Sequence, residues 1–522
     1  MSRRSTPGAP VAWLLLVLAA LAAAAPVILA ARFSPPYEFF RVPIASWVVF
    51  CLSGILLALD AAALVLWLRL RRADREAEAA GRALLEMRAA PLSAAIPAVC
   101  GAEHLARVEF PALVQTLFSR LPGVEYIHLK PLAGGYSGST TVLARLQRRP
   151  GESPLPRSFV VKLGGRREMA GEHGRYLQHV LAFLPQAPHF YQYAERQEWA
   201  AIAYEFAGLD LDAEVQSLEQ FYRGYAGAEV AGIIGDILAH LGRAWYQGGA
   251  AAPADLSAEY SLLPRKRAQI VESVAEIVDP DDPYRANLSG SEAAPQPRLR
   301  PRFCPAPDLP WYDPLAWLWG WPPPVPPVPL HRSIVHGDLN ARNVLVELIP
   351  GGQKRVWFID FSHTGNGLTA DRTAELIGAG LPLAADQGHT LRDFCRLEAD
   401  VKFLLTRLQS ENDLRLAVDF ERTLLAHEED LAVPPATEAL LDERFKKAWQ
   451  SVREIRAHAA RYAAPGDGAR PYDWALLNAT LAILYYSADQ FESKASERQQ
   501  KRYVLLAAGM LCNRICGVSA GV

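Results

Sequence analysis

The string from His336 to Asn343 reads His-Gly-Asp-Leu-Asn-Ala-Arg-Asn, and it is followed at 359–361 by Ile-Asp-Phe. These segments place two acids, Asp338 and Asp360, close in sequence to the amide of Asn343. Mg²⁺ takes hard oxygen ligands and completes its shell with phosphate and water. We therefore expect Asn343 and Asp360 to hold Mg²⁺, with Asp338 one loop away, where it can accept the proton of an attacking hydroxyl during phosphoryl transfer.

A β-hairpin is the element that must bring these groups together. Two short apolar, β-branched runs, Val344 to Glu347 and Val356 to Ile359, flank the turn composition Pro-Gly-Gly-Gln at 350–353. The residue before the first strand and the residue after the second lie at the same open end of a hairpin. Asn343 and Asp360 are those residues, so both side-chain oxygens can reach one cation.

This pattern resembles the protein-kinase catalytic loop, Asp-x-x-x-x-Asn followed by a metal-binding Asp. The His-Gly-Asp-Leu wording is more similar to the aminoglycoside phosphotransferase and choline kinase branch of that fold. The resemblance implies that Asp338 is the catalytic base, that Asn343 and Asp360 are the metal ligands, and that His336 braces the loop from behind. Two alternatives stay open: an unrelated hairpin with polar residues near its turn, and a degenerate kinase fold that binds nucleotide without turnover.

The segment that follows Asp360 supports a narrower resemblance. Ile-Asp-Phe-Ser-His-Thr-Gly, together with Arg-Asp-Phe-x-Arg-Leu-Glu at 392–398, is similar to the phosphotransferase-like ternary complex-associated domains of bacterial conflict and signalling proteins. The resemblance implies that Asp393 bonds the backbone of the catalytic loop, with Asp371 as a competing candidate. Residues 366–387 are then an insertion in the place of an activation segment.

An amino-terminal lobe should precede the catalytic string. Runs at Tyr126 to Ala133, Thr140 to Leu146 and Ser158 to Lys162 predict three strands. A glycine-rich turn lies between the first two, and its backbone N–H groups can approach phosphate oxygens. The residues that we expect to bind the nucleotide there are Gly134, Gly135, Gly138 and Ser139.

Lys162 ends the third strand, and the kinase resemblance assigns it to the nucleotide phosphates. A helix from Arg166 to Val180 should orient it through an acid, and Glu172 is our choice over Glu168, which lies so near the helix start that it can only complement the helix dipole. An apolar strand, Trp199 to Phe206, then leads to the hinge, where the backbone of Glu205, Phe206 and Ala207 would bind adenine. An ordinary strand-end carboxylate is the equal alternative for Glu205.

Composition limits the class of protein. A chain of 522 residues exceeds one ordinary core, and a two-lobed kinase fold would use most of it. The formal net charge of −2 argues against a nucleic-acid surface. The six cysteines are dispersed, and no Cys/His cluster has zinc spacing.

The first seventy residues differ in kind. Residues 11–31 and 44–68 are almost wholly apolar runs, each long enough to cross a bilayer. Arginines before the first run and after the second predict, by the positive-inside rule, a transmembrane hairpin with both flanks in the cytoplasm. A cleaved signal peptide is the alternative for the first run. The sequence thus predicts a protein of the bacterial inner or plasma membrane with a cytoplasmic catalytic part.

We therefore expect an α+β, two-lobed protein kinase-like fold preceded by two transmembrane helices. The predicted parts are a cytoplasmic tail (1–10), the transmembrane hairpin (11–68), a juxtamembrane linker helix (69–98), a β-rich N-lobe (99–207) and a helical C-lobe (208–520). The C-lobe contains a Pro/Trp-rich segment, 301–330, predicted to be an ordered loop packed on the lobe rather than a regular helix, with a polyproline ligand as the alternative.

The expected function is a membrane-anchored phosphotransferase that uses ATP and Mg²⁺ to phosphorylate a hydroxyl of a small molecule or a protein. A nucleotide-binding signalling module and a protein kinase are the alternatives. The acceptor and the oligomeric state are not legible in the sequence.

Overall fold

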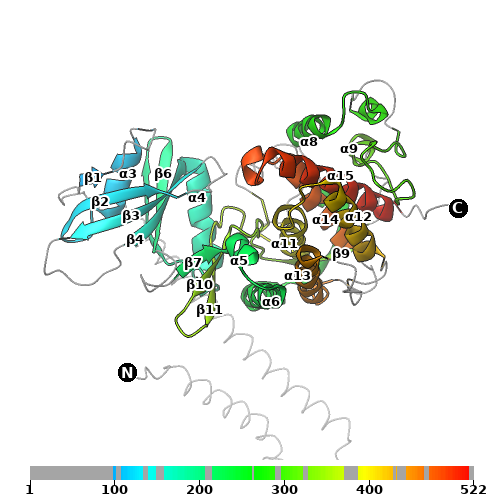
Figure 1. Cartoon of the computed structure of the whole chain (residues 1–522). Coiled ribbons are helices and arrows are strands. Elements are labelled where there is room, and N and C mark those ends of the chain that lie inside the picture. Colours follow the sequence, from blue (N-terminus) through cyan, green and yellow to red (C-terminus); the bar gives the residue numbers. More distant parts are fainter. Residues whose placement is uncertain are drawn as a thin grey trace, which may run out of the picture. The chain divides into compact units, whose positions relative to one another are not determined.

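The computed structural model divides the chain into two units, 1–93 and 94–522. It describes only residues of the second unit: 98–100, 107, 109–132, 139–148, 158–205, 214–260, 264–288, 296–320, 327–368, 386–426, 431, 442–463 and 470–516 (Figure 1).

A six-stranded sheet opens the described part, with strand order β1-β2-β3-β4-β6-β5 (Figure 1). Its strands are β1 (Ala98–Cys100), β2 (Val124–Pro131), β3 (Thr140–Arg148), β4 (Ser158–Gly165), β5 (Phe190–Arg196) and β6 (Trp199–Glu205). β1 and β2 are parallel, and the other neighbours are antiparallel. The sheet contains the three strands predicted from the sequence, in the predicted order.

Side-chain alternation along β4 separates its two faces. Phe159, Val161 and Leu163 belong to the core that lies between the sheet and α3 (Glu109–Phe118). Lys162 points to the opposite face, where α4 (Arg166–Arg175) packs against β4 and β6. Because α4 continues as the π-helical turn η3 (Tyr176–Val180), the helix predicted over 166–180 is present in two geometries.

The second sheet carries the predicted hairpin. β10 (Val344–Leu348) pairs antiparallel with β11 (Lys354–Phe358), and β7 (Glu214–Ser217) pairs along the other edge of β10. The register opposes Val344 to Phe358, so Asn343 and the residues after β11 lie at one end of the hairpin. A third sheet has the order β12-β9-β8 and consists of β12 (Gly388–His389), β9 (Val328–Ser333) and β8 (Ala250–Ala254).

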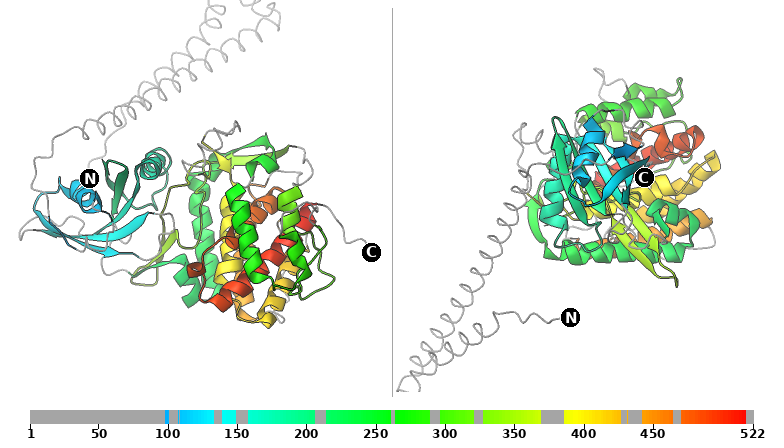
Figure 2. Two further views of the ribbon diagram at one scale, coloured as in Figure 1. Left: turned by 90° about the horizontal axis from the view of Figure 1, so that it is seen from above. Right: turned by 90° about the vertical axis from the view of Figure 1, so that its left-hand side faces the viewer.

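Helices make up most of the other described residues. They are α5 (Leu218–Gly224), α6 (Gly227–Ala244), η4 (Tyr246–Gly248), α7 (Leu256–Glu259), α8 (Pro264–Ile277), η5 (Pro283–Asn287), α9 (Pro314–Gly320), α11 (Leu391–Asp400), η6 (Val401–Leu405), α12 (Glu411–Leu425), α13 (Glu443–Ala459), α14 (Arg470–Leu484), η8 (Ala488–Gln490) and α15 (Lys494–Ile515). α11 packs on α14, and α14 packs on α15 (Figure 2). Buried side chains of these helices form one core that extends to Met169 of α4 and Ile202 of β6.

The Pro/Trp-rich segment differs in one respect from the prediction of a loop. α9 forms inside it, because Pro314 occupies the first helical position, where its missing N–H costs nothing, and Asp313 accepts from the N–H groups of Leu315 and Ala316. The segment does pack on the lobe, since Trp311 is fully buried and lies against Gly509 of α15.

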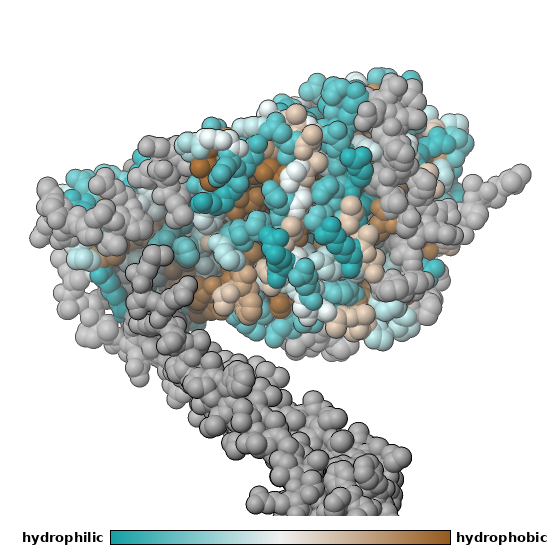
Figure 3. All heavy atoms as spheres, turned by 90° about the horizontal axis from the view of Figure 1, so that it is seen from below, coloured by the Kyte–Doolittle hydropathy of each residue, from teal (hydrophilic) through white to brown (hydrophobic). Residues whose placement is uncertain are grey.

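The predicted fold class was wrong in adding transmembrane helices. No helix over the described residues is both long and apolar enough to cross a membrane. α15, the longest of them with 22 residues, carries charged side chains such as Lys501 and Arg502 and buries most of its surface against other helices. On the face in Figure 3, hydrophilic side chains alternate with small apolar areas.

The predicted localisation was wrong for the same reason. It assumed a membrane protein with a cytoplasmic catalytic part, and it depended on those transmembrane helices. The runs 11–31 and 44–68, on which that prediction was based, lie outside the described residues, as do the tail 1–10 and the linker up to residue 97.

Candidate active site

Asp393 holds the loop from Ile334 to Asn343 in place through hydrogen bonds to the loop backbone. This carboxylate, on α11, is fully buried and accepts from the backbone N–H of His336 at 2.7 Å and of Gly337 at 2.8 Å. Tyr246 donates its hydroxyl to the same carboxylate at 2.7 Å. The structure thus places Asp393 where the resemblance put it, whereas the competing Asp371 lies outside the described residues.

Gly337 is required by the shape of this loop. Its φ is +83°, a conformation that L side chains rarely adopt. A Cβ at this position would lie 2.5 Å from the carbonyl oxygen of His363 and 2.7 Å from the Cα of Gly367. The loop therefore packs closely against the segment that follows Asp360. This packing brings the catalytic loop, which carries Asp338, near Asp360.

Asp338 has a hydrogen-bonding partner on each carboxylate oxygen. Arg396 of α11 donates to one oxygen at 3.0 Å, and the amide of Asn343 donates to the other at 3.2 Å. Burial alone would raise the pKa of Asp338, but the charge of Arg396 lowers it below its usual value. Asp338 is therefore ionised and fixed in direction, as an acceptor of a hydroxyl proton must be.

Asn343 and Asp360 lie at the same open end of the β10–β11 hairpin, as the sequence predicted. The N–H of Ile359 donates to the carbonyl oxygen of Asn343 at 3.0 Å, which continues the ladder one step beyond the strands. Asp360 then turns with φ of +63°, the left-handed region that Asp tolerates better than most residues. The hydroxyl of Ser362 donates to Asp360 at 2.7 Å and fixes its carboxylate.

Lys162 joins the two lobes. Its Nζ donates to Glu172 at 2.7 Å and to Asp360 at 2.9 Å, across 198 residues of sequence in the second case. Tyr204 donates to the other oxygen of Glu172 at 3.1 Å. Burial alone would lower the pKa of Lys162, but the two carboxylates raise it, and Lys162 in turn lowers the pKa of Asp360. The choice of Glu172 over Glu168 agrees with this geometry.

His336 lies behind the loop, fully buried against Phe361 and Phe358. Its Nε2 is 3.2 Å from the carbonyl oxygen of Ile359, to which a protonated Nε2 donates. His336 thereby ties the start of the catalytic string to the residue before Asp360, which fits a bracing role.

The nucleotide-binding residues predicted at the glycine turn and the hinge are described only in part. Gly134, Gly135, Gly138, Phe206 and Ala207 lie outside the described residues. Ser139 is buried directly before β3. Glu205 ends β6, and its N–H donates to the carbonyl oxygen of His189 at 2.9 Å.

Sequence reasoning missed a role for Arg396. This residue contacts Asp338 and also pairs with Asp400, one helical turn further along α11. Asp400 in turn accepts from the N–H of Ala341 at 2.8 Å. The available signal was the spacing of Asp393, Arg396 and Asp400, which puts all three on one face of a helix.

The side-chain oxygens at the end of the hairpin are of the kind that bind Mg²⁺. Because the amide nitrogen of Asn343 donates to Asp338, its carbonyl oxygen is turned away from Asp338. One oxygen of Asp360 bonds to Lys162 and Ser362, which leaves the second as a ligand. No group of three or more His, Cys, Asp or Glu side chains in the described part could hold a metal. Two oxygen ligands suit an ion that keeps water and phosphate in its shell.

Comparisons with known proteins agree with the resemblance seen in the sequence. The family model of ternary complex associated domain 9 matches residues 125–303. The solved structure of aminoglycoside phosphotransferase APH(4)-Ia shares 12% identity, with a TM-score of 0.30, over 72% of this chain and 99% of that one. A thermostable mutant of that enzyme, in a ternary complex with AMP-PNP and hygromycin B, shares 13% identity, with a TM-score of 0.29, over the same shares of both chains.

At such identities and TM-scores, these likenesses carry no argument about substrates or activity. No curated protein matches the chain. The suspected resemblance to phosphotransferases of this type, and to a ternary complex-associated domain, is confirmed.

Proposed function

We propose that this chain is a phosphotransferase that moves the γ-phosphoryl group of ATP to a hydroxyl acceptor with Mg²⁺ bound. The observation that carries the proposal is the paired contact of Lys162 with Glu172 and Asp360. The contact supports the proposal because it holds a cation beside Asp360, at the end of the hairpin where Asn343 also lies.

Each residue then has one task. Lys162, oriented by Glu172, binds phosphate oxygens of the nucleotide. Asn343 and Asp360 would hold Mg²⁺, which neutralises phosphate charge when bound. Asp338 orients the acceptor hydroxyl and takes its proton.

The transfer conserves atoms and charge. The acceptor oxygen forms a bond to the γ-phosphorus while the bond from that phosphorus to the β–γ bridging oxygen breaks. ADP leaves with the electron pair of that bond. The hydroxyl proton passes to the carboxylate of Asp338, which later returns it to solvent.

Phosphate transfer from radiolabelled ATP tests the proposal, with a metabolite extract as acceptor and EDTA as the metal-free control. We expect Asp338→Asn to lower the rate by a factor of about 10² to 10⁴, the usual contribution of a positioned base. The matched control is Asp281→Asn, because Asp281 is exposed and pairs with exposed Arg302 at 2.6 Å. Equal labelling by wild type and Asp338→Asn, or full activity in EDTA, would overturn the proposal. Label on protein rather than on a small molecule would identify a protein kinase.

A further inference from the structure

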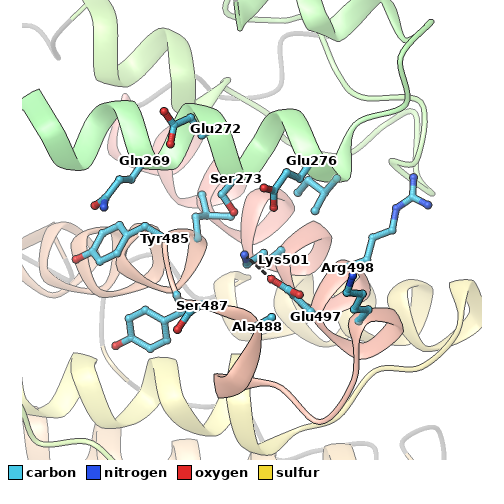
Figure 4. A pocket seen from close by; sticks show the side chains of 14 residues that line it. Gln269, Glu272, Ser273, Glu276, Tyr485, Ser487, Ala488, Glu497, Arg498 and Lys501 are labelled. Carbon is cyan, nitrogen blue, oxygen red and sulfur yellow. Dashed lines mark hydrogen bonds and ion pairs between the residues drawn. The ribbon is translucent and has the colours of Figure 1, made fainter. Parts of the chain in front are cut away.

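A pocket of about 690 Å³ lies between α8 and the segment that joins α14 to α15 (Figure 4). Its volume is within the range of about 300 to 1,000 Å³ that small-molecule sites occupy. Among the residues that the structure describes, neither those at the hairpin end nor those proposed to bind nucleotide line it.

The wall formed by α8 is polar and contains a buried hydroxyl without a partner. Glu272, Ser273 and Glu276 face the pocket, while Ile270 and Val274 on the other side of α8 are buried in the core (Figure 4). Ser273 is only 6% exposed, and its Oγ has no hydrogen-bond partner among the described residues. A buried polar group normally has one, so this hydroxyl is available to a ligand.

The two carboxylates of this wall are also available. Within the described part of the chain, neither Glu272 nor Glu276 has an ion-pair partner, and both side chains are exposed. They are one helical turn apart on the same face, where like charges destabilise a helix slightly. A bound cation would remove that repulsion.

The wall formed by α15 has the opposite charge. Lys501 pairs with Glu497 at 2.8 Å, and Arg498 pairs with Asp279 at 2.6 Å, so these cations are already compensated. Lys494, the first residue of α15, also lines the pocket and has no ion pair among the described residues. It adds a positive charge to the helix N-terminus, where an anion is favoured.

The pocket is linked to the proposed base through one tyrosine ring and one guanidinium group. Tyr486 lines the pocket, and the guanidinium of Arg396 lies over its ring, 5.6 Å from the centroid. The same guanidinium donates to Asp338 at 3.0 Å. Further along this segment, Gln490 accepts from Arg342 of the catalytic loop. Burial raises the pKa of Tyr486, the charge of Arg396 lowers it, and the negative charge of Asp338 raises it.

We propose that this pocket binds the phosphate acceptor and that the acceptor is a hydroxyl-bearing zwitterion, with its ammonium group at Glu272 and Glu276 and its anionic group at Lys494. The Ser273 hydroxyl hydrogen-bonds the ligand between the two charges. The acceptor hydroxyl points past Tyr486 toward Asp338. This inference rests on the proposed function, and it adds the substrate class and the site.

Three probes that share one hydroxyl separate the two charges. They are the tripeptide Ala-Ser-Ala with free ends, its N-acetyl form and its C-terminal amide. Binding to the full chain is measured by calorimetry without nucleotide. We expect the free tripeptide to bind and each capped form to bind at least tenfold more weakly. Glu272→Gln with Glu276→Gln should abolish the penalty of acetylation, and Lys494→Gln should abolish the penalty of amidation.

The matched controls are Glu443→Gln and Lys446→Gln, because these exposed partners pair with each other on α13, outside the pocket. They should leave all three affinities unchanged. No binding of the free tripeptide, or affinities that the pocket variants leave unchanged, would overturn the inference. A separate titration with ATP and Mg²⁺ distinguishes the failures: nucleotide binding that persists leaves the proposed function standing without this acceptor site.

Discussion

Replacing Asp393 by alanine should remove the hydrogen bonds that hold the catalytic loop in place. The carboxylate is fully buried and accepts three hydrogen bonds, from the N–H groups of His336 and Gly337 and from the hydroxyl of Tyr246. Each buried group left without a partner costs about 1–3 kcal/mol. Three such groups give a loss of about 3–6 kcal/mol in the free energy of unfolding, since water can satisfy some of them in the space left behind. That is a large share of the about 5–15 kcal/mol typical of native proteins.

Urea unfolding followed by tryptophan fluorescence measures this loss, and phosphate transfer measures its effect on the site. Asp393→Asn retains one acceptor oxygen, so its loss should be smaller, about 1–3 kcal/mol. At temperatures where the variants are folded, both should transfer phosphate at least tenfold more slowly than wild type, because the backbone that carries Asp338 is no longer fixed.

Asp313 supplies the matched control. It is also fully buried, and it accepts from the hydroxyl of Tyr284 and, at 2.6 Å, from the amide of Asn287. Asp313→Ala should therefore destabilise the chain by a similar amount, yet leave transfer per folded molecule within about twofold of wild type, because Asp313 caps α9 away from the loop. If Asp393→Ala unfolds at the wild-type urea concentration, or if both alanine variants lose activity equally, the reasoning is refuted.

Three further predictions concern the same site. Arg396→Gln removes the charge that lowers the pKa of Asp338 against the effect of burial, so the acid limb of the pH–rate profile should move to higher pH. The Arg396–Asp338 pair contributes stability that is present above the unfolded pKa of Asp338 and is lost as the pH falls through the lower folded pKa, and the variant should lack this contribution. Unchanged pH profiles of rate and stability would contradict this prediction. Lys162→Met leaves the carboxylates of Glu172 and Asp360 without their cation. We therefore expect weaker ATP binding by calorimetry and a free energy of unfolding that is lower by about 3–5 kcal/mol. Wild-type values for both quantities would argue against the shared contact. Gly337→Ala places a Cβ 2.5 Å from a carbonyl oxygen at positive φ, so transfer and thermal stability should both fall, and a fully active variant would show that the loop can shift.

The sequence alone indicated the candidate site residues and determined the elements nearest to them. The string from His336 to Asn343, the hairpin that follows and the order of strands leading to Lys162 are local patterns, set by turn residues and side-chain alternation over a few positions. Such patterns need no knowledge of distant contacts. This is why Asn343 and Asp360 lie at one hairpin end as predicted.

Only the tertiary structure decided which distant groups meet. The contact of Lys162 with Asp360 and the role of Arg396 join elements that the sequence spacing does not relate. The packing of the Pro/Trp-rich segment depends on burial of Trp311 against Gly509 of α15. Contacts of this kind are fixed by packing in a common core, where the free energy of burial outweighs local propensity, and no window of sequence contains both partners.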